Sequence, residues 1–257
     1  MSSPRISPVR RTLVLAGFAA ATTLLVNPAA DGAHRSARAS VRQDHILRTT
    51  TLTNPKVAHW AVVQTTVAVH RQPDASSPTI TTLDTLTGDG TQNLVLILDA
   101  ARMVSGHTWY HVRLAILPNN STGWVPRSAL GRLFIVHTHL YVNRETETAV
   151  LKQNGRTIFT TRVGVGHSYW PTPAGQFYIR DKLTDFDNSF YGPVAFGTSA
   201  RSNVLTDWPG GGYIGVHGTS LPSLIPGHIS HGCIRIVNSR ILRLAKLMPV
   251  GTPLTIT

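Results

Sequence analysis

The stretch SHGCIRI (Ser230–Ile236) contains Cys233, the only cysteine among the 257 residues of the chain. A cysteine that only fills a core has no need of the neighbours His231, Gly232 and Arg235. A fixed positive charge favours a thiolate, and a glycine lets the backbone approach a substrate closely. The pattern therefore indicates a reactive thiol rather than a packed one.

A nucleophilic thiol needs a base, a group that orients this base, and donors for the developing oxyanion. His217, within GVHGTS (Gly215–Ser220), is one candidate base, and His231 is the other. Side chains two residues apart in an extended segment point the same way, so His231 is expected beside Cys233. This favours His217 as the base, although the spacing alone leaves both open. Arg235 can also hold a substrate carboxylate.

The first 32 residues are typical of an export signal. Arginines precede an apolar run of 15 residues, Thr12–Val26, and small residues follow it. The run is too short for a membrane-spanning helix and ends at Asn27-Pro28. We expect an exported protein, periplasmic or associated with the cell wall, with no integral membrane span in its mature form. A twin-arginine route and an uncleaved anchor are the alternatives.

The composition is strongly basic and lacks a disulfide framework. Lys and Arg number 24 against 12 Asp and Glu, for a formal net charge of +12. A basic exported protein is expected to meet anionic cell-wall polymers. Nucleic acid is not an expected partner, because no basic tract with interleaved aromatics is present. A single cysteine excludes an internal disulfide.

The remainder of the chain divides into a tether and two β-rich domains. Residues 33–55 are polar and aperiodic, which predicts a linker. Residues 56–130 alternate short strands with turns, and TWYHVRL followed by GWVPRSAL resembles bacterial SH3-like domains. Within them, Trp109, Tyr110 and Trp124 either form an aromatic ligand-binding face or fill the core.

Residues 132–257 predict a second domain that is mainly β. Several strand-like runs are separated by Gly, Pro or Asn, and KQNG (Lys152–Gly155) is a hairpin signal. One helix is expected, capped by Asn238 or Ser239 and ending before Pro249.

Three blocks of this second domain resemble the L,D-transpeptidase family with the YkuD-type catalytic fold. They are VHGT (Val216–Thr219) with SHGCIRI, VGVGHSYWPTPAGQFYI (Val163–Ile179), and the ending Ile236–Ile256. The resemblance covers Leu133–Thr257, nearly half of the chain. Together with the SH3-like resemblance of residues 56–130, it implies a mainly β protein in which a small SH3-like barrel precedes a YkuD-type β-sandwich with one packed helix.

The resemblance also implies roles for individual residues. Cys233 matches the nucleophile, His217 the general acid and base, and Gly218 the carbonyl that orients the imidazole. The amides of Gly232 and Cys233 match the oxyanion donors. Ser230, His231 and Arg235 match motif positions that shape the pocket. Beyond the resemblance, Thr219 is expected to bind substrate, and TDWPGGG (Thr206–Gly212) with Tyr213 is either a loop at the pocket edge, with Trp208 and Tyr213 facing substrate, or ordinary packing.

The chemistry implied by the family is acyl transfer on peptidoglycan stem peptides. Cys233 would cleave the bond between diaminopimelate and D-Ala of a tetrapeptide stem. A second diaminopimelate would resolve the thioester and form a crosslink. Carbapenems would be inhibitors, and no cofactor or metal is implied. Related proteins hydrolyse the thioester or join a protein to peptidoglycan, and the sequence does not separate these outcomes.

Two alternative functions are a zinc site and a non-catalytic wall-binding protein. His217, His228, His231 and Cys233 could surround zinc, but a single cysteine in H-x-C matches no common zinc spacing. A non-catalytic wall-binding protein is the second reading, although the chain keeps both nucleophile and base.

Two further expectations follow from the sequence. The pKa of the Cys233 thiol should lie below its free value, and a chain that begins near Arg132 should fold independently.

Overall fold

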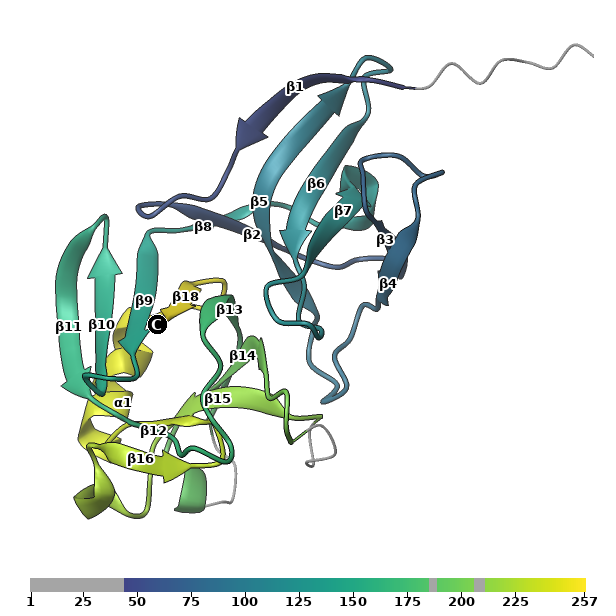
Figure 1. Cartoon of the computed structure of the whole chain (residues 1–257). Helices are drawn as coiled ribbons and strands as arrows, with labels where there is room; N and C mark the ends of the chain where they lie inside the picture. The colour runs from purple at the N-terminus through teal and green to yellow at the C-terminus, as the bar shows by residue number, and fades with distance from the viewer. Residues whose placement is uncertain (1–43, 185–188, 206–210) are drawn as a thin grey trace, which may run out of the picture. The chain divides into compact units, whose positions relative to one another are not determined.

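The computed structural model describes residues 44–184, 189–205 and 211–257 (Figure 1). Within these ranges the chain forms two large β-sheets and a single α-helix, which confirms the prediction of a mainly β protein. The expected export signal, and the expected linker up to residue 43, lie outside the described residues. In the part that is described, no helix combines the length and the apolar character needed to cross a membrane.

The first sheet contains eight strands in the order β4-β3-β7-β6-β5-β2-β8, with β1 paired to β5. Its strands are β1 Ile46–Thr51, β2 Ala58–Val62, β3 Val67–His70, β4 Thr79–Leu83, β5 Leu94–Met103, β6 Thr108–Arg113, β7 Thr122–Pro126 and β8 Phe134–Val136. Alternating apolar residues of these strands, such as Val69, Val112 and Val125, form a buried cluster. The prediction for residues 46–51 was wrong, because they pair with β5 instead of belonging to a free tether.

The three aromatics of this sheet divide between core and surface. Tyr110 is buried in the apolar cluster. Trp124 stacks on His111 with ring centroids 4.8 Å apart. Trp109 is half-buried and meets His70 edge-on at 5.7 Å. Tyr110 therefore fills the core, and the two tryptophans stay partly accessible.

The second sheet contains ten strands in the order β11-β10-β9-β18-β13-β14-β15-β17-β12-β16. Its strands are β9 Thr138–Asn143, β10 Thr148–Gln153, β11 Arg156–Arg162, β12 Gly164–Gly166, β13 Gly175–Leu183, β14 Ala195–Arg201, β15 Tyr213–His217, β16 Gly227–Ser230, β17 Ile234–Arg235 and β18 Pro253–Ile256. The expected hairpin at KQNG joins β10 to β11, with Asn154 at φ 51° and Gly155 at φ 82°. Positive φ at both residues is what a two-residue type I′ turn requires.

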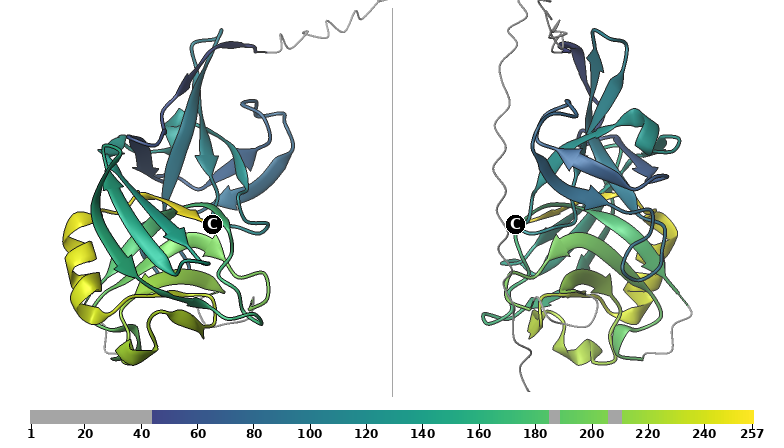
Figure 2. Two further views of the ribbon diagram at one scale, coloured as in Figure 1. Left: turned by 60° about the vertical axis from the view of Figure 1, so that its left-hand side comes forward. Right: turned by 90° about the vertical axis from the view of Figure 1, so that its right-hand side faces the viewer.

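The helix α1 (Asn238–Leu247) packs against this sheet (Figure 2). It buries Ile241 and Leu244 in the same apolar cluster as Leu140 and Phe159. The predicted cap by Asn238 or Ser239 is wrong, since the chain enters the helix through Val237 and no side chain caps its first turn.

The two sheets share a third apolar cluster. Ala58, Leu94 and Leu96 come from the first sheet, and Tyr178 comes from β13 of the second. The Tyr178 hydroxyl donates a hydrogen bond to the Leu94 carbonyl at 3.1 Å. The first sheet also continues past the expected boundary near residue 130, because β8 pairs with β2. Residues 43–257 accordingly form one compact unit.

This shared cluster changes the expectation for a shortened chain. A protein that begins at Arg132 loses Ala58, Leu94 and Leu96 from this cluster and exposes part of the Tyr178 side chain, which is 1% accessible in the whole chain. We expect its free energy of unfolding to fall by at least about 3 kcal/mol, the usual cost of emptying the surroundings of a large buried side chain. Urea denaturation of the two proteins measures the difference. An equal urea midpoint for the second sheet in both proteins would show that this sheet gains no stability from the first.

Candidate active site

The strand pairing of β15 and β17 brings the two predicted reactive groups together. These strands run parallel, with Val216 opposite Ile234 and His217 opposite Arg235. Gly215 therefore comes opposite Cys233, at the separation of about 4.8 Å usual between neighbouring strands. The candidate base and nucleophile meet because of this register, although 16 positions separate them in the sequence.

Gly215 is the point that the thiol and the imidazole share. Its N–H donates to the Cys233 Sγ at 3.3 Å. A Cβ at this position would lie 3.6 Å from the His217 Cδ2 and 3.8 Å from the Cys233 Sγ. Both reactive groups therefore lie on one side of β15, around a residue without a side chain.

The hydrogen bond of His217 fixes its tautomer. The side chain is 1% exposed, and its Nδ1 lies 2.6 Å from the Gly218 carbonyl oxygen. A carbonyl can only accept, so Nδ1 carries the proton and Nε2 is the bare nitrogen. This is the orienting contact that the sequence resemblance implied for Gly218.

Burial keeps His217 neutral. Removal from water lowers the pKa of its imidazole to about 4, against the opposing effect of the Gly218 carbonyl, and the Arg235 charge lowers it further. Since Nε2 is unprotonated near neutral pH, it can accept a proton.

The thiol is also neutral at rest, contrary to the expectation from sequence. Burial raises the pKa of Cys233, and this outweighs the lowering by the Gly215 N–H and by Arg235. The prediction of a depressed thiol pKa was wrong because it counted the nearby cation and not the desolvation of the sulfur. The resting pair is therefore thiol and imidazole rather than thiolate and imidazolium.

Ser230 holds the turn that carries the thiol. Its hydroxyl donates to the Cys233 carbonyl at 2.5 Å and accepts the Gly232 N–H at 3.1 Å. Gly232 has φ +115°, a conformation that L-residues rarely adopt. The Gly232 amide is thus engaged within the turn, and it would have to exchange this bond to act as an oxyanion donor.

A pocket with a volume of about 120 Å³ opens onto Cys233. Its walls include the aromatic residues Phe190, Tyr191 and Tyr213, together with His231 and Arg235. Tyr191 meets the His217 ring edge-on, with centroids 4.8 Å apart. These rings shield the His217 imidazole from solvent.

Arg235 supplies the buried charge of this pocket. It is 6% exposed, and its guanidinium lies 4.5 Å from the centre of the Phe190 ring. Its Nε has no hydrogen-bond partner among the described residues. A buried cation with an unused donor favours an anionic group of a ligand.

Comparison with known proteins identifies the family. The family model described as the YkuD L,D-transpeptidase catalytic domain matches residues 137–256. The YkuD protein of Bacillus subtilis (strain 168) is 30% identical over 123 residues, which are 48% of this chain and 68% of that protein. The chain belongs to the L,D-transpeptidase YkuD family.

Solved structures of the family resemble parts of this L,D-transpeptidase-family chain at low identity. The Ldtfm-avibactam carbamoyl enzyme is 22% identical with a TM-score of 0.38, over 47% of this chain and 48% of that one. An L,D-transpeptidase from Mycobacterium tuberculosis H37Rv is 15% identical with a TM-score of 0.40, over 79% of this chain and 98% of that one. The chain thus spans only about half of the first of these proteins.

Most of the site residues that were predicted from the sequence lie in or next to one pocket. Those that line the pocket are His217, Cys233, Arg235, His231 and Tyr213, whereas Ser230, Gly218 and Gly232 support them. His231 is exposed at the rim, 4.3 Å from the Trp170 ring centre. Trp208 lies outside the described residues.

Thr219 is the predicted pocket residue that lies elsewhere. It is 2% exposed, its N–H donates to the Asn238 Oδ1 at 2.9 Å, and its Oγ1 accepts the Leu221 N–H at 3.0 Å. The structure places it in the turn behind the base. Asn238, which the sequence suggested as a helix cap, instead ties α1 to this turn next to Gly218.

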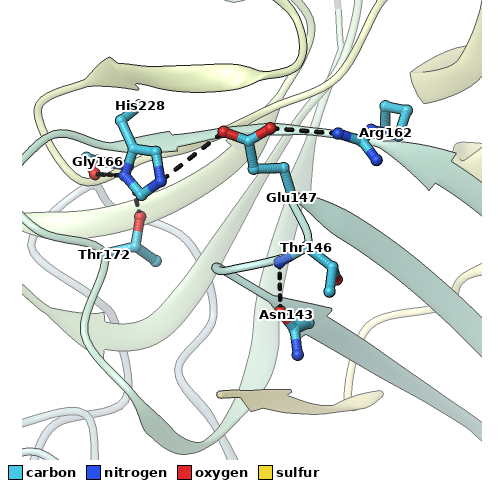
Figure 3. Close-up of polar contacts among 7 residues, drawn as sticks. All are labelled: Asn143, Thr146, Glu147, Arg162, Gly166, Thr172 and His228. Atoms are coloured by element: carbon cyan, nitrogen blue, oxygen red, sulfur yellow. Dashed lines mark hydrogen bonds and ion pairs between the residues drawn. The ribbon is translucent and has the colours of Figure 1, made fainter.

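Thr172, in the segment TPAG of the block Val163–Ile179, supports the site, although its residue type alone did not point to this role. Thr172 is 1% exposed, and its Oγ1 accepts the Gly166 N–H at 2.8 Å and donates to the Gly232 carbonyl at 2.7 Å. Figure 3 shows Thr172 beside His228, whose Nδ1 lies 3.2 Å from the Gly166 carbonyl oxygen and whose Nε2 lies 3.7 Å from Glu147. His228 thus belongs to the network beneath the nucleophile turn.

The Thr172 hydroxyl is expected to position the Gly232–Cys233 turn. Thr172→Val keeps the shape and leaves the Gly166 N–H and Gly232 carbonyl without this partner, which should lower kcat by about tenfold. Thr172→Ser keeps the hydroxyl and is the matched control, with a rate within about threefold of wild type. Steady-state kinetics of both variants test the role, and equal rates for Val and Ser would contradict it.

Proposed function

We propose that the protein is a peptidoglycan L,D-transpeptidase that works through a Cys233 acyl-enzyme. The observation that carries the proposal is the neutral pair around Gly215, a thiol and an imidazole whose bare nitrogen is Nε2. A thiol beside a buried base arranged in this way suits acyl transfer.

In the first half of the reaction, His217 Nε2 takes the proton of the Cys233 thiol as the sulfur attacks the carbonyl between diaminopimelate and D-Ala. The imidazolium then donates this proton to the D-Ala nitrogen as the amide bond breaks. D-Ala leaves with its amine, and a thioester remains on Cys233. Arg235 is placed to bind a carboxylate of the stem peptide, since its buried Nε is otherwise unused.

In the second half, the side-chain amine of another diaminopimelate attacks the thioester. His217 accepts a proton from this amine and returns it to the departing sulfur, so the free thiol is restored without any redox step. The product is a diaminopimelate–diaminopimelate crosslink. Water as acceptor would make the protein an L,D-carboxypeptidase, and an amine on a protein would make it an anchoring enzyme.

The remaining assignments concern where the enzyme works and how its chain is divided. We propose export by the segment 1–32, a linker that ends before β1, an SH3-like domain that runs from β1 to β8, and a catalytic domain that begins at β9. The positive net charge supports contact with anionic cell-wall polymers in a periplasmic or wall-associated location. The partly accessible Trp109 and Trp124 support a binding surface on the first sheet.

Mass spectrometry of muropeptides tests the proposal. The mature protein is incubated with tetrapeptide stems that end in D-Ala, and the products are weighed. Dimeric stems that have lost D-Ala support transpeptidation, tripeptides alone indicate hydrolysis, and unchanged stems contradict catalysis. Retention on purified sacculi without any D-Ala release would indicate a non-catalytic wall-binding protein.

A further inference from the structure

The pocket wall opposite the reactive pair is anchored from outside the catalytic sheet. Tyr213 lines the pocket, and two guanidinium groups lie close to its ring, Arg180 at 4.4 Å and Arg201 at 4.9 Å from the ring centre. Its hydroxyl donates to the carbonyl of Ala115 at 3.1 Å. Ala115 follows β6 of the first sheet, so a residue 98 positions earlier holds a side chain of the active-site pocket.

The loop between β6 and β7, which contains Ala115, also binds the end of β14. The side chain of Asn119 donates through Nδ2 to the Arg201 carbonyl at 2.7 Å and accepts the Arg201 N–H through Oδ1 at 3.0 Å. An amide that satisfies both backbone groups of one residue acts as a neighbouring strand would. Asn119 thus completes the hydrogen bonding of Arg201, which is opposite Tyr213 in the β14–β15 pairing.

From Arg201 the contacts lead directly to the pocket edge. The guanidinium donates to the Gly211 carbonyl through Nε at 3.1 Å and through a second nitrogen at 2.6 Å. The next residue, Ser202, donates its N–H to the Gly212 carbonyl at 2.8 Å. Ser202, Gly212 and Tyr213 all line the pocket. The position of Arg201 therefore sets the backbone on both sides of this edge.

We propose that Ala115 and Asn119, in the loop between β6 and β7, support the wall of the substrate pocket, with Asn119 as a positioning residue that acts through Arg201 and Tyr213. The kinetic consequence rests on the proposed transpeptidase function, whereas the structural consequence does not. Loosening of this wall weakens the binding of a stem peptide that fills the pocket. It leaves Cys233 and His217 in place, because β15 and β17 hold them by their own pairing.

The test compares two neighbouring variants of the full mature chain. Asn119→Ala removes both bonds to Arg201. Asn120→Gly is the matched control, because the Asn120 side chain accepts the Gln176 N–H at the start of β13 and glycine preserves its φ of +69°. Both variants lose a contact between the loop and the second sheet, but only Asn119→Ala loses the contact with Arg201.

For Asn119→Ala we expect KM for the tetrapeptide stem to rise about tenfold with kcat within about twofold, the scale of a lost pair of hydrogen bonds. Asn120→Gly should keep KM within about twofold of wild type. Tyr213→Phe, which loses only the bond to Ala115, should raise KM in the same direction. An unchanged KM in Asn119→Ala, or an equal rise in both loop variants, would overturn the specific role of Asn119.

Two readouts do not depend on the transpeptidase reaction. Hydrogen exchange of the amides of residues 199–205 and 211–215 should be faster in Asn119→Ala than in Asn120→Gly. Alkylation of Cys233 by iodoacetamide should match wild type in both. If wild type releases no D-Ala, the proposed function fails while the exchange comparison still decides this inference. If Asn119→Ala does not fold, Asn119→Asp keeps the acceptor for the Arg201 N–H and serves in the same exchange comparison, with wild-type exchange overturning the inference.

Discussion

We expect the Cys233→Ala variant to release no D-Ala and to form no thioester adduct with a carbapenem, while it keeps its fold and its retention on sacculi. The chemical loss is complete because the acyl group has no other sulfur to occupy in this chain. The structural loss is small, since the sulfur accepts one hydrogen bond of 3.3 Å from Gly215 and alanine keeps the backbone of the turn.

Intact-protein mass spectrometry checks this result directly. Wild type should gain the mass of one acyl group, and a single cysteine means that the adduct is assigned to Cys233 without mapping. Cys233→Ser is the informative control, because it keeps a nucleophilic atom and the shape of the site. It should be nearly inactive, since an alcohol is far harder to deprotonate than a thiol and an imidazole of pKa about 4 is a weak base. Normal crosslinking by Cys233→Ala would remove the nucleophile assignment.

The sequence pointed to Cys233 and His217 because each lies next to a glycine, Cys233 in the turn before β17 and His217 at the end of β15. VHGT and SHGC each place one functional side chain beside residues that allow close backbone approach, and the β15–β17 register does the rest. The mainly β fold and its one helix were predictable from turn residues and apolar spacing for the same reason. These are local features, and local features are what a single sequence displays.

What the sequence could not provide are the effects of contacts between distant segments. The raised thiol pKa depends on desolvation, and pocket aromatics such as Phe190 and Tyr191 precede the cysteine by more than 40 positions. The shared cluster around Tyr178 likewise depends on Leu94 of the other sheet. Asn238 has a residue type that suits a helix cap, but its side-chain oxygen accepts the Thr219 N–H instead. At these positions the contacts of a residue decide its role, and residue type alone does not reveal those contacts.

The His217→Ala variant is expected to lose about 10²-fold or more in kcat, the usual scale for removing a general acid and base. His231→Ala is the matched control on the same pocket. His231 is exposed at the rim beside Trp170, whereas His217 is buried against the Gly218 carbonyl. His231→Ala should therefore lose much less. Equal rates for wild type and His217→Ala would remove the assignment of the base.

The pH dependence separates His217 from an ordinary histidine. The imidazole can accept the thiol proton only while it is neutral, so kcat/KM should fall as the pH drops through its folded pKa. Burial lowers this pKa from 6.5 to about 4, and the acid limb should lie near pH 4 in wild type and in His231→Ala. A limb near pH 6.5 would show that water reaches the ring in solution.

Acid also acts on the fold through the same residue, and the two effects must be told apart. The folded pKa of His217 lies below its unfolded value, so the unfolded chain binds the extra proton as the pH falls from 6.5 to about 4. The buried imidazole thus contributes stability above pH 6.5 that is progressively lost below it. Circular dichroism at each pH identifies unfolding. A loss of kcat/KM that precedes the loss of signal, and reverses on return to pH 7, belongs to protonation of the base.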